Sequence, residues 1–146
     1  MSKLNNSLSN TDIVKIVADM GLRFNGVYSR DDLPQLREGF YVINLDDHKG
    51  KGTHWCSFYY NPTNHSIYFD AFGFPPPEEV ERKIKPYTFN DIDIQDIDSS
   101  ACGYYCIAFI KFLSNHKDKY KAFDTFINLF SEDTKQNDKV LYKILY

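Results

Sequence analysis

The sequence predicts an α+β domain in which a central mixed or antiparallel sheet is flanked by helices. Three observations lead to this prediction: helical patterns stand at both ends of the chain, strand-like runs gather between residues 40 and 72, and no repeat or long linker divides the sequence. A chain of 146 residues is long enough to bury one core. We therefore expect residues 1–146 to form a single domain, with residues 1–9 polar and flexible.

The first expected element is an amphipathic helix that ends at Gly21. Ser9, Asn10 or Thr11 precedes it and can cap its first N–H groups. Glycine adopts the left-handed conformation that often closes a helix, so Gly21 is a suitable end point. The apolar residues recur at a spacing that places them on one helix face: Ile13, Val14, Ile16, Val17 and Met20.

Three strands are expected over residues 40–45, 54–60 and 66–72, because β-branched and aromatic residues dominate these runs. A polar, glycine-bearing loop separates the first two strands. The segment Asn61-Pro62-Thr63-Asn64-His65 joins the second and third strands and is typical of a hairpin turn. Strands joined by such a short loop pair antiparallel.

The second half of the chain predicts mainly helices. The run Pro75-Pro76-Pro77 ends the third strand, and residues 78–84 have the pattern of a short helix. Isoleucines and acids then alternate at Ile92, Ile94 and Ile97, a pattern that predicts one more strand. Helical patterns follow over about 102–115, 119–130 and 138–145.

Composition and charge argue against several classes of function. The formal net charge is −3 and the isoelectric point is about 5.7, so the chain as a whole does not attract nucleic acid. The cysteines are odd in number and irregularly spaced, which argues against a disulfide framework and favours a reducing compartment. No signal segment and no apolar run approaching ~18 residues is present, so no membrane association is expected.

Cys102 is the first candidate for chemistry. Small residues precede it and an apolar run follows it, so we expect it at the N-terminus of a helix. The unpaired N–H groups and the helix dipole stabilise an anion there, which favours the nucleophilic thiolate. Cys106 is the alternative nucleophile, but it lies one turn further along, where the effect of the dipole has faded.

His54 is the expected base for this thiol. It begins a strand, so it can be held firmly with its tip open to a cleft, whereas His48, His65 and His116 fall in loops or beyond a helix end. Asp70 ends the next strand, and a hairpin would place it beside His54. We expect Asp70 to accept the Nδ1 proton of His54, with Nε2 facing the thiol.

Two other interpretations of these residues stay open. In the first, Cys102 and Cys106 pack in the core, His54 is an ordinary strand residue, and Asp70 caps a turn. In the second, His54 and Cys56 on one strand face meet Cys102 and Cys106 on one helix face, and the four side chains hold zinc. The hydrolase interpretation expects no metal.

The candidate residues lie within four motifs that have a distinctive order. The motifs are Gly52-Thr53-His54-Trp55, Tyr68-Phe69-Asp70-Ala71-Phe72-Gly73-Phe74, Gln95, and Ser100-Ala101-Cys102-Gly103. Together they resemble the adenovirus protease (adenain) family of cysteine endopeptidases, whose members include proteases of adenoviruses, virophages and Maverick-type elements. The similarity extends over about residues 11–113 and implies the fold shared by adenain and the proteases of ubiquitin-like proteins.

The resemblance implies a role for each matched residue. Cys102 would be the nucleophile, and His54 would be the general base and later the acid. Asp70, where adenain has a glutamate, would orient the imidazole. Gln95 would direct its side-chain amide into the oxyanion hole beside the backbone N–H of Cys102, a contribution of about 3 kcal/mol to the barrier.

The resemblance also implies a function. The chain would be a thiol protease that cuts viral precursor and capsid proteins after small, glycine-type residues during virion maturation, with Trp55 and Gly103 on the substrate side. It would act as a monomer in the virion and the interior of the host cell. The alternatives are a deconjugating protease for a ubiquitin-like protein and a non-catalytic domain, with or without bound zinc, that binds a protein.

No cofactor is required by the sequence. Adenain is activated by a viral peptide that is disulfide-linked to one of its cysteines, but the corresponding residues 74–94 here contain no cysteine. Adenain is also basic and uses DNA as a cofactor, whereas this chain is acidic. We therefore expect no disulfide-linked peptide, and the acidic charge argues against DNA as an activator; a peptide bound without a disulfide stays open.

Overall fold

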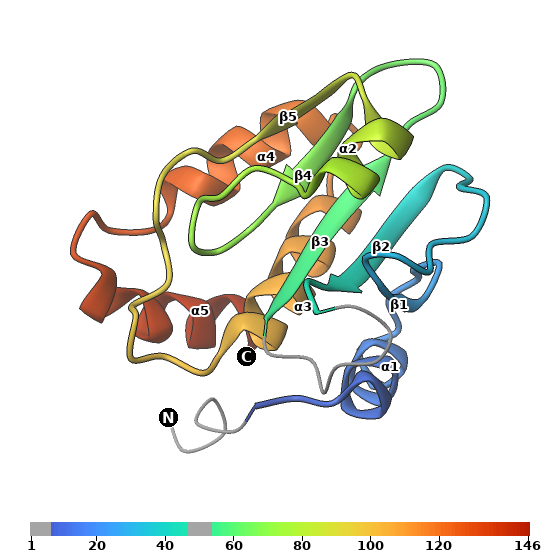
Figure 1. Cartoon of the computed structure of the whole chain (residues 1–146). Coiled ribbons are helices and arrows are strands. Elements are labelled where there is room, and N and C mark those ends of the chain that lie inside the picture. Colours follow the sequence, from blue (N-terminus) through green and yellow to red (C-terminus); the bar gives the residue numbers. More distant parts are fainter. Residues whose placement is uncertain (1–6, 47–53) are drawn as a thin grey trace.

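A five-stranded sheet with helices on both faces forms the centre of the molecule (Figure 1). The computed structural model describes residues 7–46 and 54–146, so His48 and residues 1–6 of the segment expected to be flexible lie outside it. The predicted α+β class is confirmed. In chain order the elements are α1 (Asn10–Asp19), β1 (Val27–Ser29), β2 (Gly39–Asn44), β3 (Trp55–Tyr60), β4 (Ser66–Phe69), α2 (Glu78–Ile84), β5 (Tyr87–Phe89), α3 (Cys102–Ser114), α4 (Lys119–Asn128), the 3₁₀ turn η2 (Thr134–Gln136) and α5 (Asn137–Leu145).

The helices begin close to the positions that the sequence predicts. At the start of α1, the Ser9 hydroxyl accepts a hydrogen bond from the Asp12 N–H at 3.1 Å, and the Asp12 carboxylate accepts one from the Ser9 N–H at 2.9 Å. This reciprocal pair is a capping box. Asp118 caps α4 by accepting from the N–H groups of Tyr120 and Lys121. Local side-chain chemistry therefore accounts for both starts.

The sheet is mixed, with strand order β1-β2-β3-β4-β5. The pairs β2–β3 and β3–β4 are antiparallel, and the hairpin signal at residues 61–65 predicts the second of these pairings. The outer pairs β1–β2 and β4–β5 are parallel. The sequence did not predict β1 or β5, because each has three half-buried residues and so has no clear apolar alternation.

The predicted strand over residues 92–97 is wrong. These residues form an irregular segment after β5, and only the middle isoleucine packs inside: Ile92 is 51% exposed, Ile97 is 86% exposed and Ile94 is buried. The N–H groups of Ile94 and Gln95 both donate to the Ala71 carbonyl, at 2.8 and 2.9 Å. Convergence of two adjacent N–H groups on one acceptor is incompatible with a strand ladder.

The two faces of the sheet are covered unequally. On one face α3 and α4 pack against the sheet, and α1 and α5 pack against α3. Phe109 of α3 stacks on Phe69 of β4 with ring centroids 5.3 Å apart. The other face packs against the short α2, where Tyr41 and Phe58 stack at 4.9 Å beside Val80 and Ile84. Most of the core therefore lies between the sheet and α3.

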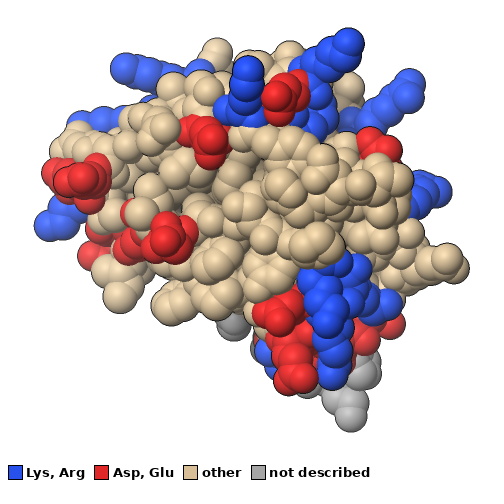
Figure 2. Space-filling model, turned by 90° about the horizontal axis from the view of Figure 1, so that it is seen from above, with Lys and Arg blue, Asp and Glu red and all other residues tan. Residues whose placement is uncertain are grey.

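The distribution of surface charge and the character of the helices both bear on function. The face drawn in Figure 2 has acidic and basic side chains around its rim and mainly uncharged residues at its centre, so no continuous basic track crosses this face. Within the described ranges, none of the helices combines the length and apolar character needed to span a bilayer.

Candidate active site

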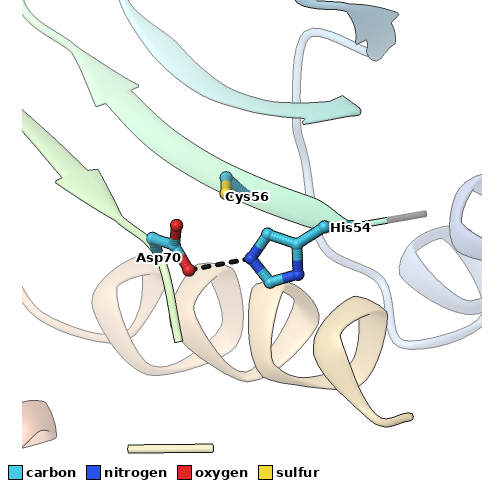
Figure 3. Close-up of side chains that lie close together, drawn as sticks. All are labelled: His54, Cys56 and Asp70. Atoms are coloured by element: carbon cyan, nitrogen blue, oxygen red, sulfur yellow. Dashed lines mark hydrogen bonds and ion pairs between the residues drawn. The ribbon is translucent and has the colours of Figure 1, made fainter. Parts of the chain in front are cut away.

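His54 and Asp70 meet at the edge of the sheet where β3 begins and β4 ends. His54 directly precedes β3 and Asp70 directly follows β4. Because these strands are antiparallel, the start of one lies beside the end of the other. The His54 Nε2 and Asp70 Oδ1 atoms are 2.8 Å apart, and the Asp70 side chain is fully buried (Figure 3). The structure thus brings together the imidazole and the carboxylate that the sequence pairs.

The ring of His54 has the opposite orientation from the predicted one. Nε2 bonds to Asp70 and Nδ1 is left for Cys102, so the prediction that Asp70 accepts the Nδ1 proton is wrong. The physical reason lies in Asp70, whose short side chain is fixed by backbone contacts deep in the fold. The imidazole reaches it only with the ring nitrogen that lies further from its own backbone.

Burial and hydrogen bonding have opposite effects on His54. Removal from water lowers the pKa of His54, but hydrogen bonds to Asp70 and Cys102, together with the negative charges of both groups, raise it to about 9. The imidazole is therefore protonated at neutral pH. An imidazolium in this position stabilises an anion beside it, and the neighbouring group on the helix side is the thiol of Cys102.

Phe72 holds the Asp70 carboxylate and Asn90 holds the Asp70 backbone, and neither role was predicted from the sequence. The Phe72 N–H donates to Asp70 Oδ1 at 2.8 Å, and the Phe72 ring stacks on His54 with centroids 4.8 Å apart. The Asn90 side chain accepts from the Asp70 N–H at 3.2 Å and donates to the Asp70 carbonyl at 2.6 Å. Phe72 lay within a quoted motif, but nothing in the sequence signalled that Asn90, twenty residues away, reaches Asp70.

The three free cysteines have different surroundings. Cys102 begins α3, whose first turn has no side-chain cap, and it is 9% exposed. Cys106 lies one turn deeper and Cys56 lies in β3, and both are buried. Burial is the main cause that raises the pKa of the Cys56 and Cys106 thiols well above the ordinary value. Among the three thiols, Cys102 has the environment that suits a nucleophile.

Gln95 is buried in the irregular segment before α3. Its Nε2 donates to the Ser99 carbonyl at 2.9 Å and approaches the Ser99 hydroxyl at 3.4 Å. An amide nitrogen carries two hydrogens, and the bond to the Ser99 carbonyl uses one of them. The described contacts therefore connect Gln95 to the residues that lead into Cys102, and they do not assign its amide to an oxyanion.

Trp55 and Gly103 are joined by the N-terminal segment. The Trp55 Nε1–H donates to the Leu8 carbonyl at 2.8 Å. The Leu8 side chain lies so close to Gly103 that a Cβ atom there would be 3.1 Å from Leu8 Cδ1. The glycine after Cys102 thus lets Leu8 pack against the start of α3. The sequence analysis did not identify Leu8 as part of this region.

A metal ion has one candidate site among the described residues. The ligand atoms of His54, Cys56 and Asp70 lie within 4.8 Å of one another. This group differs from the four-residue zinc set considered from the sequence, because it contains Asp70 in place of Cys102 and Cys106. A metal that binds His54 Nε2 would displace the bond from this nitrogen to Asp70 Oδ1, whereas the buried Asp70 Oδ2 has no hydrogen-bond partner among the described residues and could serve as a ligand.

Comparisons with known proteins find distant similarity to a viral protease. No protein-family model matches the chain. The protease of Human adenovirus A serotype 12 is 25% identical in an alignment 142 residues long, and the match covers 75% of this chain and 66% of that protein. The structural alignment with the crystal structure of the ASFV pS273R protease covers 99% of this chain and 55% of the ASFV chain, at 19% sequence identity and a TM-score of 0.49. The chain therefore spans just under two thirds of the adenovirus protein that it matches, and their homology is distant.

Proposed function

We propose that this distant homologue of the adenain-like cysteine proteases is itself a cysteine endopeptidase, with Cys102 as nucleophile and His54 as its acid–base partner. One observation carries the proposal. The 2.8 Å bond between His54 and buried Asp70 fixes an imidazole that also interacts with the thiol at the start of α3. The alternative in which these residues only pack gives no reason for a protonated imidazole between a carboxylate and a thiol.

Acylation follows from this arrangement. The Cys102 thiolate attacks the carbonyl carbon of the scissile peptide bond, and the negative charge moves to the carbonyl oxygen. The N–H groups at the start of α3 are available as donors to that oxygen. We assign to Gln95 only its second amide hydrogen, which approaches the Ser99 hydroxyl at 3.4 Å, because the first is bonded to the Ser99 carbonyl. The intermediate then collapses, and the imidazolium of His54 gives its Nδ1 proton to the leaving amine.

Deacylation uses the same groups in reverse. The neutral imidazole of His54 removes a proton from water, the resulting hydroxide attacks the thioester carbon, and the Cys102 thiolate leaves. Throughout the cycle Asp70 accepts the Nε2–H bond, which keeps the ring oriented and stabilises its positive charge. Asp70 itself exchanges no proton.

The proposed substrates are viral precursor and capsid proteins, cut after small residues during virion maturation. The relative that matches is a protease of a human adenovirus. Bulky neighbours of Cys102, among them Trp55 and Leu8, support a preference for glycine-type residues because they leave little space for a side chain before the scissile bond. We place the activity in the virion and the host-cell interior, with the protein acting as a monomer.

We propose that no disulfide-linked peptide and no DNA is needed for activity. Cys56 and Cys106 are buried and Cys102 is the proposed nucleophile, so no further accessible thiol is left for a peptide to pair with. The net charge of −3 and the mixed charges on the face in Figure 2 both weigh against a nucleic-acid activator. Activity measured with and without DNA, and with and without a reducing agent, tests both statements.

A cleavage assay tests the proposed function. Wild type and Cys102→Ala are incubated with two substrate sets: peptides from capsid precursors that carry glycine before the cleaved bond, and fusions to a ubiquitin-like protein with a Gly-Gly end. We expect wild type to cut the first set and Cys102→Ala to cut neither. Cleavage of the fusions alone would instead support the deconjugating function, and no cleavage of either set would contradict a peptidase.

A further inference from the structure

The segment between β5 and α3 needs support from elsewhere in the fold. Residues 94–101 carry Gln95 and lead into Cys102, yet they belong to no helix or strand. Their backbone is held by a few contacts, such as the bond from the Ser99 N–H to the Asp96 carbonyl at 2.9 Å. Such a segment keeps a defined geometry only if other elements fix it.

The C-terminal residues supply three separate contacts to this segment. The buried Asn137 donates from Nδ2 to the Ile94 carbonyl at 2.8 Å. The Thr134 hydroxyl donates to Asp96 Oδ1 at 3.0 Å. The Ser99 hydroxyl lies 3.0 Å from Asp138 Oδ2 and 3.1 Å from Asp138 Oδ1. Side chains of η2 and α5 thus bind the segment near its start, its middle and its end.

Ser99 is the point at which these contacts reach the candidate site. A carboxylate only accepts hydrogen bonds, so the Ser99 hydroxyl hydrogen points to Asp138. The lone pairs of the hydroxyl then face two other groups: the Ala101 N–H at 3.2 Å and the Gln95 amide at 3.4 Å. Asp138 therefore sets the direction of the Ser99 hydroxyl. That hydroxyl contacts both the backbone that leads into Cys102 and the Gln95 amide, which lie on the two sides of the oxyanion hole proposed above.

Asp138 is itself held by α3. The Tyr105 hydroxyl donates to Asp138 Oδ1 at 2.8 Å. Tyr105 is buried one turn after Cys102, so the carboxylate connects the first turn of α3 with the segment that precedes it. The Asp138 carboxylate therefore binds both the segment that precedes Cys102 and the helix that begins there.

We infer that Asp138, acting through Ser99, is a positioning residue that fixes Gln95 and the start of α3 for stabilisation of the oxyanion. This inference rests on the proposed protease function. Without the carboxylate, the Ser99 hydroxyl is free to rotate and to donate elsewhere. The Gln95 amide keeps its bond to the Ser99 carbonyl but loses the fixed orientation of the hydroxyl beside it. The thiolate and His54 lie on the other side of Cys102 and have no bond to Asp138, so they keep their arrangement.

Two reactions of Cys102 separate this role from general support of the fold. Hydrolysis of a fluorogenic peptide that ends in Gly-Gly needs the oxyanion hole, whereas alkylation of Cys102 by chloroacetamide needs only the thiolate and passes through no oxyanion. We expect Asp138→Ala to lower kcat about tenfold, with KM within about twofold, and to leave the alkylation rate within about twofold. Alkylation is measured by mass spectrometry of the peptide that contains Cys102.

Three further variants complete the test. Asp138→Asn keeps an acceptor oxygen and should recover most of the lost kcat. Ser99→Ala should reproduce the loss, and Ser99→Ala combined with Asp138→Ala should cost no more than either alone, because both remove the same contact. Asp124→Ala removes the same charge from an exposed position on α4 and should match wild type.

The outcomes distinguish the inference from the function on which it rests. If Asp138→Ala retains wild-type kcat, or loses hydrolysis and alkylation in equal proportion, Asp138 has no positioning role in catalysis. If wild type neither hydrolyses the peptide nor is alkylated selectively at Cys102, the proposed function fails as well. Faster hydrogen exchange of the Ala101 amide in Asp138→Ala would then record a purely structural contact.

Discussion

The two halves of α3 differ in what surrounds them. The first turn begins at Cys102 and lies among polar groups from distant segments, including the linked pair His54 and Asp70 and the Asp138 carboxylate. The second half lies among aromatic rings: Phe109 contacts Phe40, Phe69, Phe123 and Phe126, with centroid distances from 5.3 to 6.2 Å. One helix thus belongs to the candidate site at its start and to the main core further along.

This difference suggests a division between chemistry and stability. Apolar burial in the second half provides a large share of the folding free energy, while the polar start adds directional bonds whose net contribution to stability is small. The start of the helix can therefore be placed accurately because the remainder is fixed in the core. Substitutions at the start of α3 should reduce activity, whereas substitutions in its second half should reduce stability.

The largest expected effect is on activity, at the start of α3. Cys102→Ala removes the nucleophile and should lower kcat/KM for peptide hydrolysis by about 10⁴-fold or more. Its thermal unfolding should stay close to that of wild type, because the side chain changes little in volume. Cys106→Ala, one turn deeper, is the matched control and should retain activity. The reverse result would make Cys106 the nucleophile.

The next effect is on stability, in the aromatic half. Phe109 is fully buried, so Phe109→Ala should reduce the free energy of unfolding by about 3–5 kcal/mol. Phe74 is 65% exposed, and Phe74→Ala should change it by less than about 0.5 kcal/mol. Urea unfolding measures both. A small effect at Phe109 would mean that α3 does not anchor the core.

A smaller effect is expected for the residue that orients His54. Asp70→Asn keeps the shape of the side chain but removes its negative charge, and should lower kcat by roughly a thousandfold. The KM should change little, because Asp70 is buried and does not touch the substrate. An Asp70→Asn variant with wild-type kcat would show that the 2.8 Å bond to His54 is not used in catalysis.

The smallest effect is the pH dependence of stability. The pKa of His54 is raised to about 9 in the folded state from an ordinary value of 6.5, so protonation of His54 favours folding. This stabilisation is fully present below pH 6.5 and is lost as pH rises through about 9. Wild type should therefore lose stability relative to His54→Gln between these values in thermal unfolding. A constant difference between the two proteins would contradict the raised pKa.

The sequence was most informative where function depends on local pattern. The helix start at Cys102, the strand start at His54 and the hairpin that brings Asp70 alongside all follow from turn signals and periodicity. The α+β class followed from the same signals. These features depend on residues that are close in sequence, so they can be predicted from a single sequence.

The remaining features depend on contacts between distant segments. The short parallel strands β1 and β5 are held by their neighbours and have no pattern of their own. The orientation of the His54 ring depends on how Asn90 and Phe72 anchor Asp70. Likewise, the contact between Asp138 and Ser99 joins residues thirty-nine positions apart, and neither residue type signals the other.

Labelling with a thiol-directed peptide electrophile that ends in Gly-Gly tests the central claim most directly, because it requires substrate binding and a reactive thiolate together. The modified residue is identified by mass spectrometry in wild type and in His54→Ala. We predict modification of wild type at Cys102 and a much slower reaction in His54→Ala. Equal labelling of the two proteins, or modification confined to Cys56 or Cys106, would contradict a Cys102–His54 catalytic pair.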